Sequence, residues 1–404
     1  MLDESLLEAP EALARADARG LLRGAAGAGA RVRTGLRHAT EAGLDKLQPE
    51  GRPRAVLVAG PGPATACVSD LLGALANGAV PVTRLRPTGD LAAAGALRWS
   101  LPGWAGPVDL LLLVTPDGTE PGLAALVDQA YRRGCTVVAV APSGAPLADA
   151  IGETRGLAVP LAPGPYDAYE SPDTPEQPGG LPGLREQGPV QLLAGQPVGA
   201  PGVFWALLTP LLLLIDRLGL APSGPTVIQS LAERLDHVAE RCGPAIATYS
   251  NPAKTLAAEL AGALPLLWSE GDIAGAAARH WSATFAALPG RPALAAELPE
   301  AITAHGALLA GAFAAGADPG DFFRDRVDEP ESLRARVVLL REGAPGGDSA
   351  AVAARDLAYA NDTPVSELEP AEGSNSLEAA AELIATADFA AVYLALADSD
   401  SPWA

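Results

Sequence analysis

The sequence contains little of several residue types on which common functions depend. Its 404 residues include three cysteines, two lysines and 4% aromatic residues. The cysteines, Cys67, Cys135 and Cys242, are widely spaced and odd in number, so we expect neither a disulfide framework nor a metal site. Positive charge is scarce, because 28 Lys and Arg stand against 48 Asp and Glu, a net charge of −20. Nucleic acid and anionic membranes bind basic patches, so we expect neither as a partner.

Targeting signals and membrane-spanning runs are not evident in the sequence either. The N-terminal segment MLDESLLEAPEALARAD is acidic from its third residue, whereas a signal peptide begins with basic residues. The uncharged residues 192–215 are interrupted by three prolines, and their continuous apolar part is too short to span a bilayer. Together with unpaired cysteines, these features predict a cytoplasmic protein.

Short apolar runs alternate with amphipathic segments in two parts of the chain. The first part has runs at 55–60, 80–84, 109–118, 135–144 and 157–161. The second has runs at 264–268, 336–340 and 364–368, with helical patterns near 252–262, 272–287, 299–315, 349–359 and 375–397. Such alternation is typical of parallel sheets covered by helices on both faces. We therefore predict an α/β protein with two doubly wound, three-layer domains.

The segments between these runs set the predicted domain limits. We expect N-terminal helices, a first α/β domain, a Pro- and Gly-rich loop, connecting helices and a second α/β domain, with limits 1–50, 51–161, 162–202, 203–245 and 246–404. Pro210 is expected to break or kink the first connecting helix. Ligands of doubly wound sheets bind beyond the carboxyl ends of the strands, which favours the turns at 60–65, 115–119 and 142–145.

Several motifs occur in an order that resembles one family. They are AGPGPATACVSDLL (59–72), LLTPLLLLIDRLGL (207–220), NPAKTLAAELAGALPLLW (251–268), RPALAAELPE (291–300) and DFAAVYLALADSDSP (388–402). Together they resemble the bifunctional phosphoglucose/phosphomannose isomerases, which are built from two SIS (sugar isomerase) domains. The resemblance implies two SIS domains, a homodimer and a sugar phosphate as ligand, and we expect no cofactor.

The resemblance also assigns phosphate-binding turns, which here carry unusual residues. The family loop SYSGNT corresponds to residues 115–120, where Asp117 and Glu120 replace hydroxyl donors. Two unit charges about 4 Å apart interact by about 4 kcal/mol at an effective dielectric of about 20, half of the about 8 kcal/mol of micromolar binding. We expect these carboxylates to repel phosphate. The candidate ligand-binding residues in the three turns are Gly60, Gly62, Thr65, Thr115, Asp117, Gly118, Thr119 and Ser143.

The catalytic positions that the resemblance implies are replaced as well. Ala287 stands where the family has its proton-transferring Glu, and Thr303 stands where it has the ring-opening His. The family's Arg and its C-terminal Lys find no counterpart in this sequence. His305 and Glu300 are kept as candidate catalytic residues. Each has a structural alternative, since a lone helical histidine such as His305 also suits a surface or a hydrogen-bonded core position, and Glu300 belongs to a structural ELPE segment.

Three functions are compatible with these residues. The first is a sugar-phosphate isomerase-like protein with a degenerate, inactive or much altered site. The second is an active aldose–ketose isomerase with relocated catalytic residues. The third is a non-catalytic structural or regulatory dimer. The joint replacement of base, acid, cation and phosphate ligands favours the first.

Overall fold

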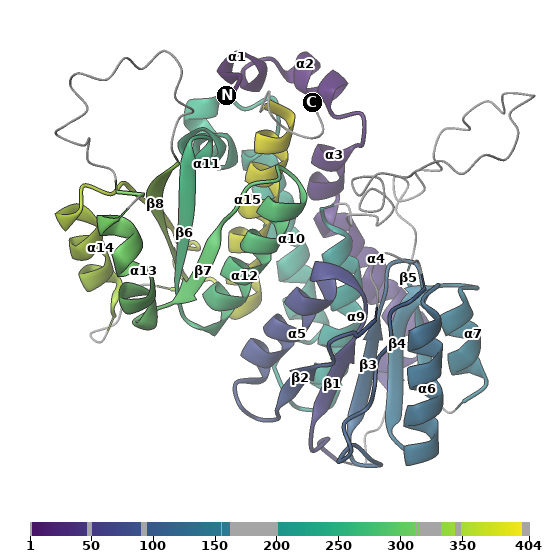
Figure 1. Ribbon diagram of the computed structural model, residues 1–404. Helices are drawn as coiled ribbons and strands as arrows, with labels where there is room; N and C mark the ends of the chain where they lie inside the picture. Colours follow the sequence, from purple (N-terminus) through teal and green to yellow (C-terminus); the bar gives the residue numbers. More distant parts are fainter. Residues whose placement is uncertain are drawn as a thin grey trace, which may run out of the picture. The chain divides into compact units, whose positions relative to one another are not determined.

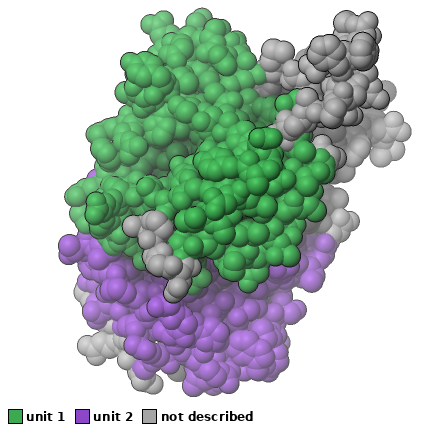
Figure 2. Space-filling model, turned by 90° about the vertical axis from the view of Figure 1, so that its left-hand side faces the viewer, with its two compact units in different colours: residues 1–18, 229–404 green, residues 19–228 purple. Residues whose placement is uncertain are grey.

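The computed structural model describes residues 2–46, 51–89, 95–154, 156–161, 201–311, 313–314, 333–343 and 349–397. The chain forms two compact units, coloured separately in Figure 2: residues 19–228, and residues 1–18 together with 229–404. The Pro- and Gly-rich loop predicted over 162–202 lies outside the described residues except for its last two positions. Each unit contains one parallel sheet, and each is described by itself.

The unit of residues 19–228 contains a five-stranded parallel sheet of order β2-β1-β3-β4-β5 (Figure 1). The strands are β1 (Val56–Ala59), β2 (Val82–Arg84), β3 (Leu110–Val114), β4 (Thr136–Pro142) and β5 (Leu157–Leu161). Each coincides with a run predicted from the sequence. All residues of β1 and β3 are buried, as expected for central strands covered on both faces.

Helices cover both faces of this first sheet (Figure 1). On one face, α6 (Pro121–Arg133) and α7 (Pro146–Gly152) pack onto alternate strand residues, among them Leu57, Leu111 and Leu113. On the other face lie α4 (Ala28–Glu41), α5 (Gly62–Ala76) and α9 (Val203–Arg217). The predicted three-layer arrangement is therefore confirmed in this unit.

Helix α9 continues through Pro210, so of the break or kink predicted there, the break is wrong. Every residue from Val203 to Ile215 is buried. Packing on all sides stabilises the helix by more than the loss of the one backbone hydrogen bond that proline removes. Three short helices precede α4 in the chain, α1 (Glu4–Leu7), α2 (Pro10–Ala16) and α3 (Leu21–Ala26), and α10 (Pro225–Arg241) follows α9.

The other unit contains a four-stranded parallel sheet of order β7-β6-β8-β9. The strands are β6 (Ala263–Glu270), β7 (Leu294–Glu297), β8 (Arg334–Arg341) and β9 (Val365–Leu368). Three of them were predicted. Edge strand β7, with the sequence LAAE and no fully buried residue, was not, because it offers no apolar run. In each sheet the second strand along the chain lies at the edge, and the first, third and fourth strands follow it in that order. The two units therefore repeat one fold.

Helices α13 (Glu300–Ala310) and α14 (Ala351–Ala360) cover one face of this sheet, and α11 (Pro252–Leu260), α12 (Asp272–Ala287) and α15 (Ser376–Ala397) cover the other (Figure 1). By length and composition α15 could cross a membrane. However, 94% of its apolar window is buried inside the protein, which is typical of the core helix of a soluble domain.

Lys254 acts as a buried connector within this unit. Its Nζ donates to the carbonyl oxygens of Leu7 at 2.5 Å, Pro244 at 2.9 Å and Ile246 at 2.8 Å. Burial lowers the pKa of the ammonium group. Asn251 accepts from the backbone N–H groups of Ala253 and Lys254 and so caps α11. The NPAK motif thus has a structural role, joining α1 to α11.

Candidate functional site

The loop after β3, predicted to bind phosphate, is occupied by one of its own carboxylates. The hydroxyl of Thr115 donates to Oδ1 of Asp117 at 3.0 Å, and the backbone N–H of Thr119 donates to the same oxygen at 3.2 Å. The N–H of Gly118 donates in turn to Oγ1 of Thr115 at 3.0 Å. These are the kinds of donor that bind phosphate oxygens in such a turn. The Asp117 carboxylate therefore accepts from two of the donors of this loop.

Glu120 adds a second negative charge to this loop. Burial and, to a lesser extent, the charge of Asp117 raise the pKa of the Glu120 carboxyl, while Arg98 acts in the opposite direction. Its Oε2 is buried and has no hydrogen-bond partner among the described residues. The loop after β3 therefore carries two carboxylates, and their expected repulsion of phosphate stays a prediction.

The turn after β1 is shaped by close backbone approach. A Cβ at Gly60 would lie 1.9 Å from the carbonyl oxygen of Val114, so only glycine fits between the ends of β1 and β3. The hydroxyl of Thr65 is buried and donates to the carbonyl of Pro61 at 3.0 Å. Gly62 has φ +75° and begins α5. These three candidates hold the turn together, and the Thr65 hydroxyl already has a partner.

The loops after β3 and β4 contact one another through Gly118. Gly118 has φ +67°, and a Cβ there would lie 2.6 Å from Cβ of Ala145. The N–H of Leu147 donates to the carbonyl of Gly118 at 3.2 Å. Ser143 lies exposed at the turn after β4. The structure thus brings together Thr115, Asp117, Gly118 and Thr119, whereas Ser143 stays outside their hydrogen-bond network.

His305 pairs with a buried tryptophan. The indole N–H of Trp268 donates to Nδ1 of His305 at 2.9 Å, and Trp268 is fully buried. Burial lowers the pKa of the imidazole, and because Nδ1 accepts the indole N–H, the neutral ring carries its proton on Nε2. This geometry supports the structural alternative for His305, a histidine that satisfies the Trp268 donor.

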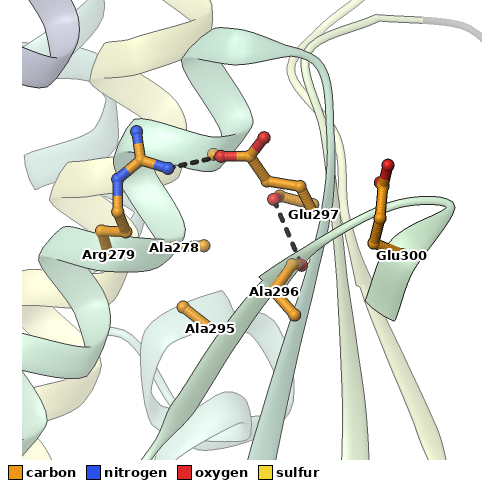
Figure 3. Close-up of a pocket in the computed structure, with 8 residues that line it drawn as sticks. Ala278, Arg279, Ala295, Ala296, Glu297 and Glu300 are labelled. Carbon is orange, nitrogen blue, oxygen red and sulfur yellow. Dashed lines mark hydrogen bonds and ion pairs between the residues drawn. The ribbon is translucent and has the colours of Figure 1, made fainter. Parts of the chain in front are cut away.

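A cavity of about 290 Å³ lies at the carboxyl ends of β6 and β7 (Figure 3). The cavity is lined by four small residues and four polar ones: Ser269, Gly275, Ala278, Arg279, Ala295, Ala296, Glu297 and Glu300. Figure 3 shows Arg279 of α12 and Glu297 of β7 pointing toward one another, while Glu300 stands apart at the start of α13. Arg279 donates to Glu297 at 2.5 Å.

This cavity contains one predicted residue and several that sequence reasoning missed. Glu300 was a candidate, whereas Ser269, Arg279 and Glu297 were not. The ELPE segment, residues 297–300, was a usable signal, because it places two carboxylates at the end of a strand and the start of a helix. Arg279 could not be recognised, since its partner lies 18 residues later in the chain.

Other ionisable groups of this unit pair with one another. His280 Nε2 lies 2.7 Å from Oδ1 of Asp388, which joins α12 to α15. Arg341, at the end of β8, pairs with Glu367 and Glu369. Within the part of the chain that the structure describes, no group of three His, Cys, Asp or Glu side chains could hold a metal ion.

Comparison with solved structures shows a shared fold. Solved structures with the same architecture include a putative phosphosugar isomerase from Clostridium difficile 630, at 11% identity, 95% coverage of both chains and a TM-score of 0.58. A putative sugar binding protein from Salmonella typhimurium LT2 has 13% identity, with 91% of this chain and 98% of that chain covered, and a TM-score of 0.54. Tagatose-6-phosphate ketose/aldose isomerase from Escherichia coli has 14% identity, coverage of 95% and 93%, and a TM-score of 0.54. At these identities the likeness shows the fold, two parallel-sheet α/β domains as in phosphosugar isomerases.

The family comparison is more specific for one part of the chain. Residues 249–402 match the bacterial phospho-glucose isomerase C-terminal SIS domain. For residues 249–402, this match supports the SIS phosphoglucose isomerase family to which the sequence motifs pointed. No curated protein sequence matches the chain significantly.

Proposed function

We propose that this chain is a phosphosugar-isomerase-like protein whose site is degenerate, so that it does not interconvert hexose phosphates at an enzymatic rate. The observation that carries the proposal is the Asp117 carboxylate, which accepts the hydrogen bonds of Thr115 and Thr119 in the loop after β3. A substrate phosphate would have to displace this internal anion and then remain beside Glu120.

The remaining chemistry supports the same proposal. Aldose–ketose isomerisation requires a base between C1 and C2, an acid/base that opens the ring and a cation near the enediolate. Ala287 ends α12 and Thr303 is an exposed residue of α13, and neither side chain can act as a general acid or base at neutral pH. His305 is engaged by Trp268. Nothing in the loop after β3 replaces the missing cation, since its own charged groups are the two carboxylates.

An active enzyme with relocated residues is the second candidate. Its support is the cavity beside β7, where Glu297 and Glu300 could act as bases and Arg279 is a cation. Against it, Arg279 is already paired with Glu297, which reduces its ability to stabilise an enediolate. The third possibility, a dimer without a small ligand, lacks an observation of its own.

A coupled assay with the purified full chain tests the proposal. Fructose 6-phosphate is supplied, and glucose 6-phosphate formation is followed through its dehydrogenase. We expect no turnover above the buffer rate for the parent protein. Turnover that Glu300→Gln abolishes and Glu153→Gln preserves would establish the second candidate instead. The predicted homodimer is checked on the same preparation by sedimentation equilibrium.

A further inference from the structure

The cavity beside β7 carries an excess of negative charge. Arg279 and Glu297 form one ion pair, with about half of each side chain exposed (45% and 54%). Glu300 also lines the cavity and has no hydrogen bond or ion pair among the described residues. One positive and two negative side chains leave a net charge of −1. A phosphate ester meets repulsion here, whereas a cation is attracted.

Gly275 of α12 leaves room for the ion pair between Arg279 and Glu297 that lines the cavity. A Cβ at Gly275 would lie 2.9 Å from Oε1 of Glu297 and 3.4 Å from Nη1 of Arg279. Glycine is unfavourable inside a helix, yet here it lets the Glu297–Arg279 pair lie directly against α12. The cavity therefore keeps its polar wall because position 275 has no side chain.

The buried end of the cavity offers a hydroxyl that is only weakly engaged. Ser269 is 1% exposed, and its Oγ lies 3.5 Å from the carbonyl oxygen of Ala296. Hydroxyl hydrogen bonds to oxygen normally measure about 2.5 to 3.0 Å, so this contact is a poor one. A ligand hydroxyl that enters the cavity would give Ser269 a better partner.

We infer that this cavity binds a small hydroxylated amine, an amino sugar without a phosphate group. The ammonium group would pair with the Glu300 carboxylate, and ring hydroxyls would bond to Ser269 and to the exposed edges of Arg279 and Glu297. The volume of about 290 Å³ is near the lower limit of ordinary ligand pockets, about 300 Å³, which suits one sugar ring. This site lies in the other unit from the loop after β3, so the inference does not depend on the isomerase assay.

The test uses the full chain and three probes, glucosamine, glucose and glucose 6-phosphate, with binding measured by isothermal titration calorimetry. We expect glucosamine to bind about fivefold or more tightly than glucose, the ratio that one unit-charge contact near 4 Å supplies even in water. Glucose 6-phosphate should bind more weakly than either. Glu300→Gln should reduce the glucosamine preference to near unity. Glu153→Gln removes an exposed carboxylate from the other unit and should leave the preference unchanged.

Three results would overturn the inference. They are equal binding of glucosamine and glucose, stronger binding of glucose 6-phosphate, and no glucosamine binding at millimolar concentration. Ala278→Leu fills the cavity wall and provides a second check. If this variant is folded by circular dichroism and still binds glucosamine as the parent does, the ligand lies elsewhere and the assignment is wrong.

Discussion

Thr115 and Asp117 are hydrogen-bonded to one another across a single intervening residue, with 3.0 Å between the Thr hydroxyl and the carboxylate. The same carboxylate accepts from the backbone of Thr119 at 3.2 Å. A loop of this type in an open α/β sheet normally points its donors at a ligand anion. Here the donors and the anion belong to the same loop.

Removing that carboxylate should restore an anion site. In Asp117→Ser the Thr115 hydroxyl and the Thr119 amide lose their internal acceptor, and one of two negative charges disappears. We expect inorganic phosphate to bind about tenfold more tightly than to the parent, in line with one charge-assisted contact. Phosphorus NMR titration measures this. Asp128→Ser, which removes an exposed carboxylate of α6, is the control; an equal gain in that variant would contradict the explanation.

The half-buried carboxyl of Glu120 should make a pH-dependent contribution to stability. Its folded-state pKa is raised above the ordinary 4.5, mainly by burial, so ionisation costs more in the folded state. The associated stability is present below pH 4.5 and is lost as the pH rises through the folded-state pKa. We expect Glu120→Gln to raise the Tm by about 2 °C at pH 7 and by much less at pH 4. A Tm gain independent of pH would show that the charge is not responsible.

His305 should produce the opposite pH dependence. Burial lowers the pKa of His305 below 6.5, so the imidazole binds a proton less readily in the folded state than in the unfolded chain. The contribution of the neutral imidazole to the free energy of unfolding is present above pH 6.5 and is lost as the pH falls through the folded-state pKa. The difference in unfolding free energy between pH 7.5 and pH 5.5, measured in urea, should be smaller in His305→Gln than in the parent. The exposed histidine variant His237→Gln should behave like the parent, and identical pH profiles for all three proteins would refute the assignment.

Lys254 should be among the most sensitive positions of its unit. Lys254→Met keeps the length of the side chain but leaves the carbonyls of Leu7, Pro244 and Ile246 without their donor. We expect a loss of about 3 kcal/mol in the free energy of unfolding, since buried acceptors are left unsatisfied. Arg132→Met, at a side chain that is 76% exposed, should change it by less than about 0.5 kcal/mol. A loss below about 1 kcal/mol for Lys254→Met would mean that water replaces the ammonium group.

Gly275→Ala should separate stability from binding. The added methyl group displaces Glu297 from Arg279, a surface pair worth about 1 kcal/mol or less, while alanine favours the helix by about 1 kcal/mol. We expect little net change in urea unfolding but a clear loss of glucosamine binding. Gly306→Ala, whose Cβ meets open space in α13, should gain stability and keep the affinity. Unchanged glucosamine affinity in Gly275→Ala would place the ligand away from this ion pair.

Much of the fold could be predicted because a buried strand must be apolar. The runs that became β1, β3, β4 and β6 show this directly, and α12 begins and ends at the predicted residues, 272 and 287. Strand β7 was missed because it lies at a sheet edge, where LAAE needs no apolar run. The break expected at Pro210 did not occur, because burial of α9 on all sides outweighs one lost hydrogen bond.

By itself the sequence determined the two-domain α/β class and the carboxylates in the expected phosphate loop, since periodicity and residue type are local properties. Only the tertiary structure decided what these groups contact. It turned Asp117 toward Thr115 and Thr119, paired His305 with Trp268, and brought Arg279 beside Glu297. Hydrogen bonds and ion pairs act over a few ångströms in space, and the spacing of residues along the chain does not reveal which side chains folding will bring that close.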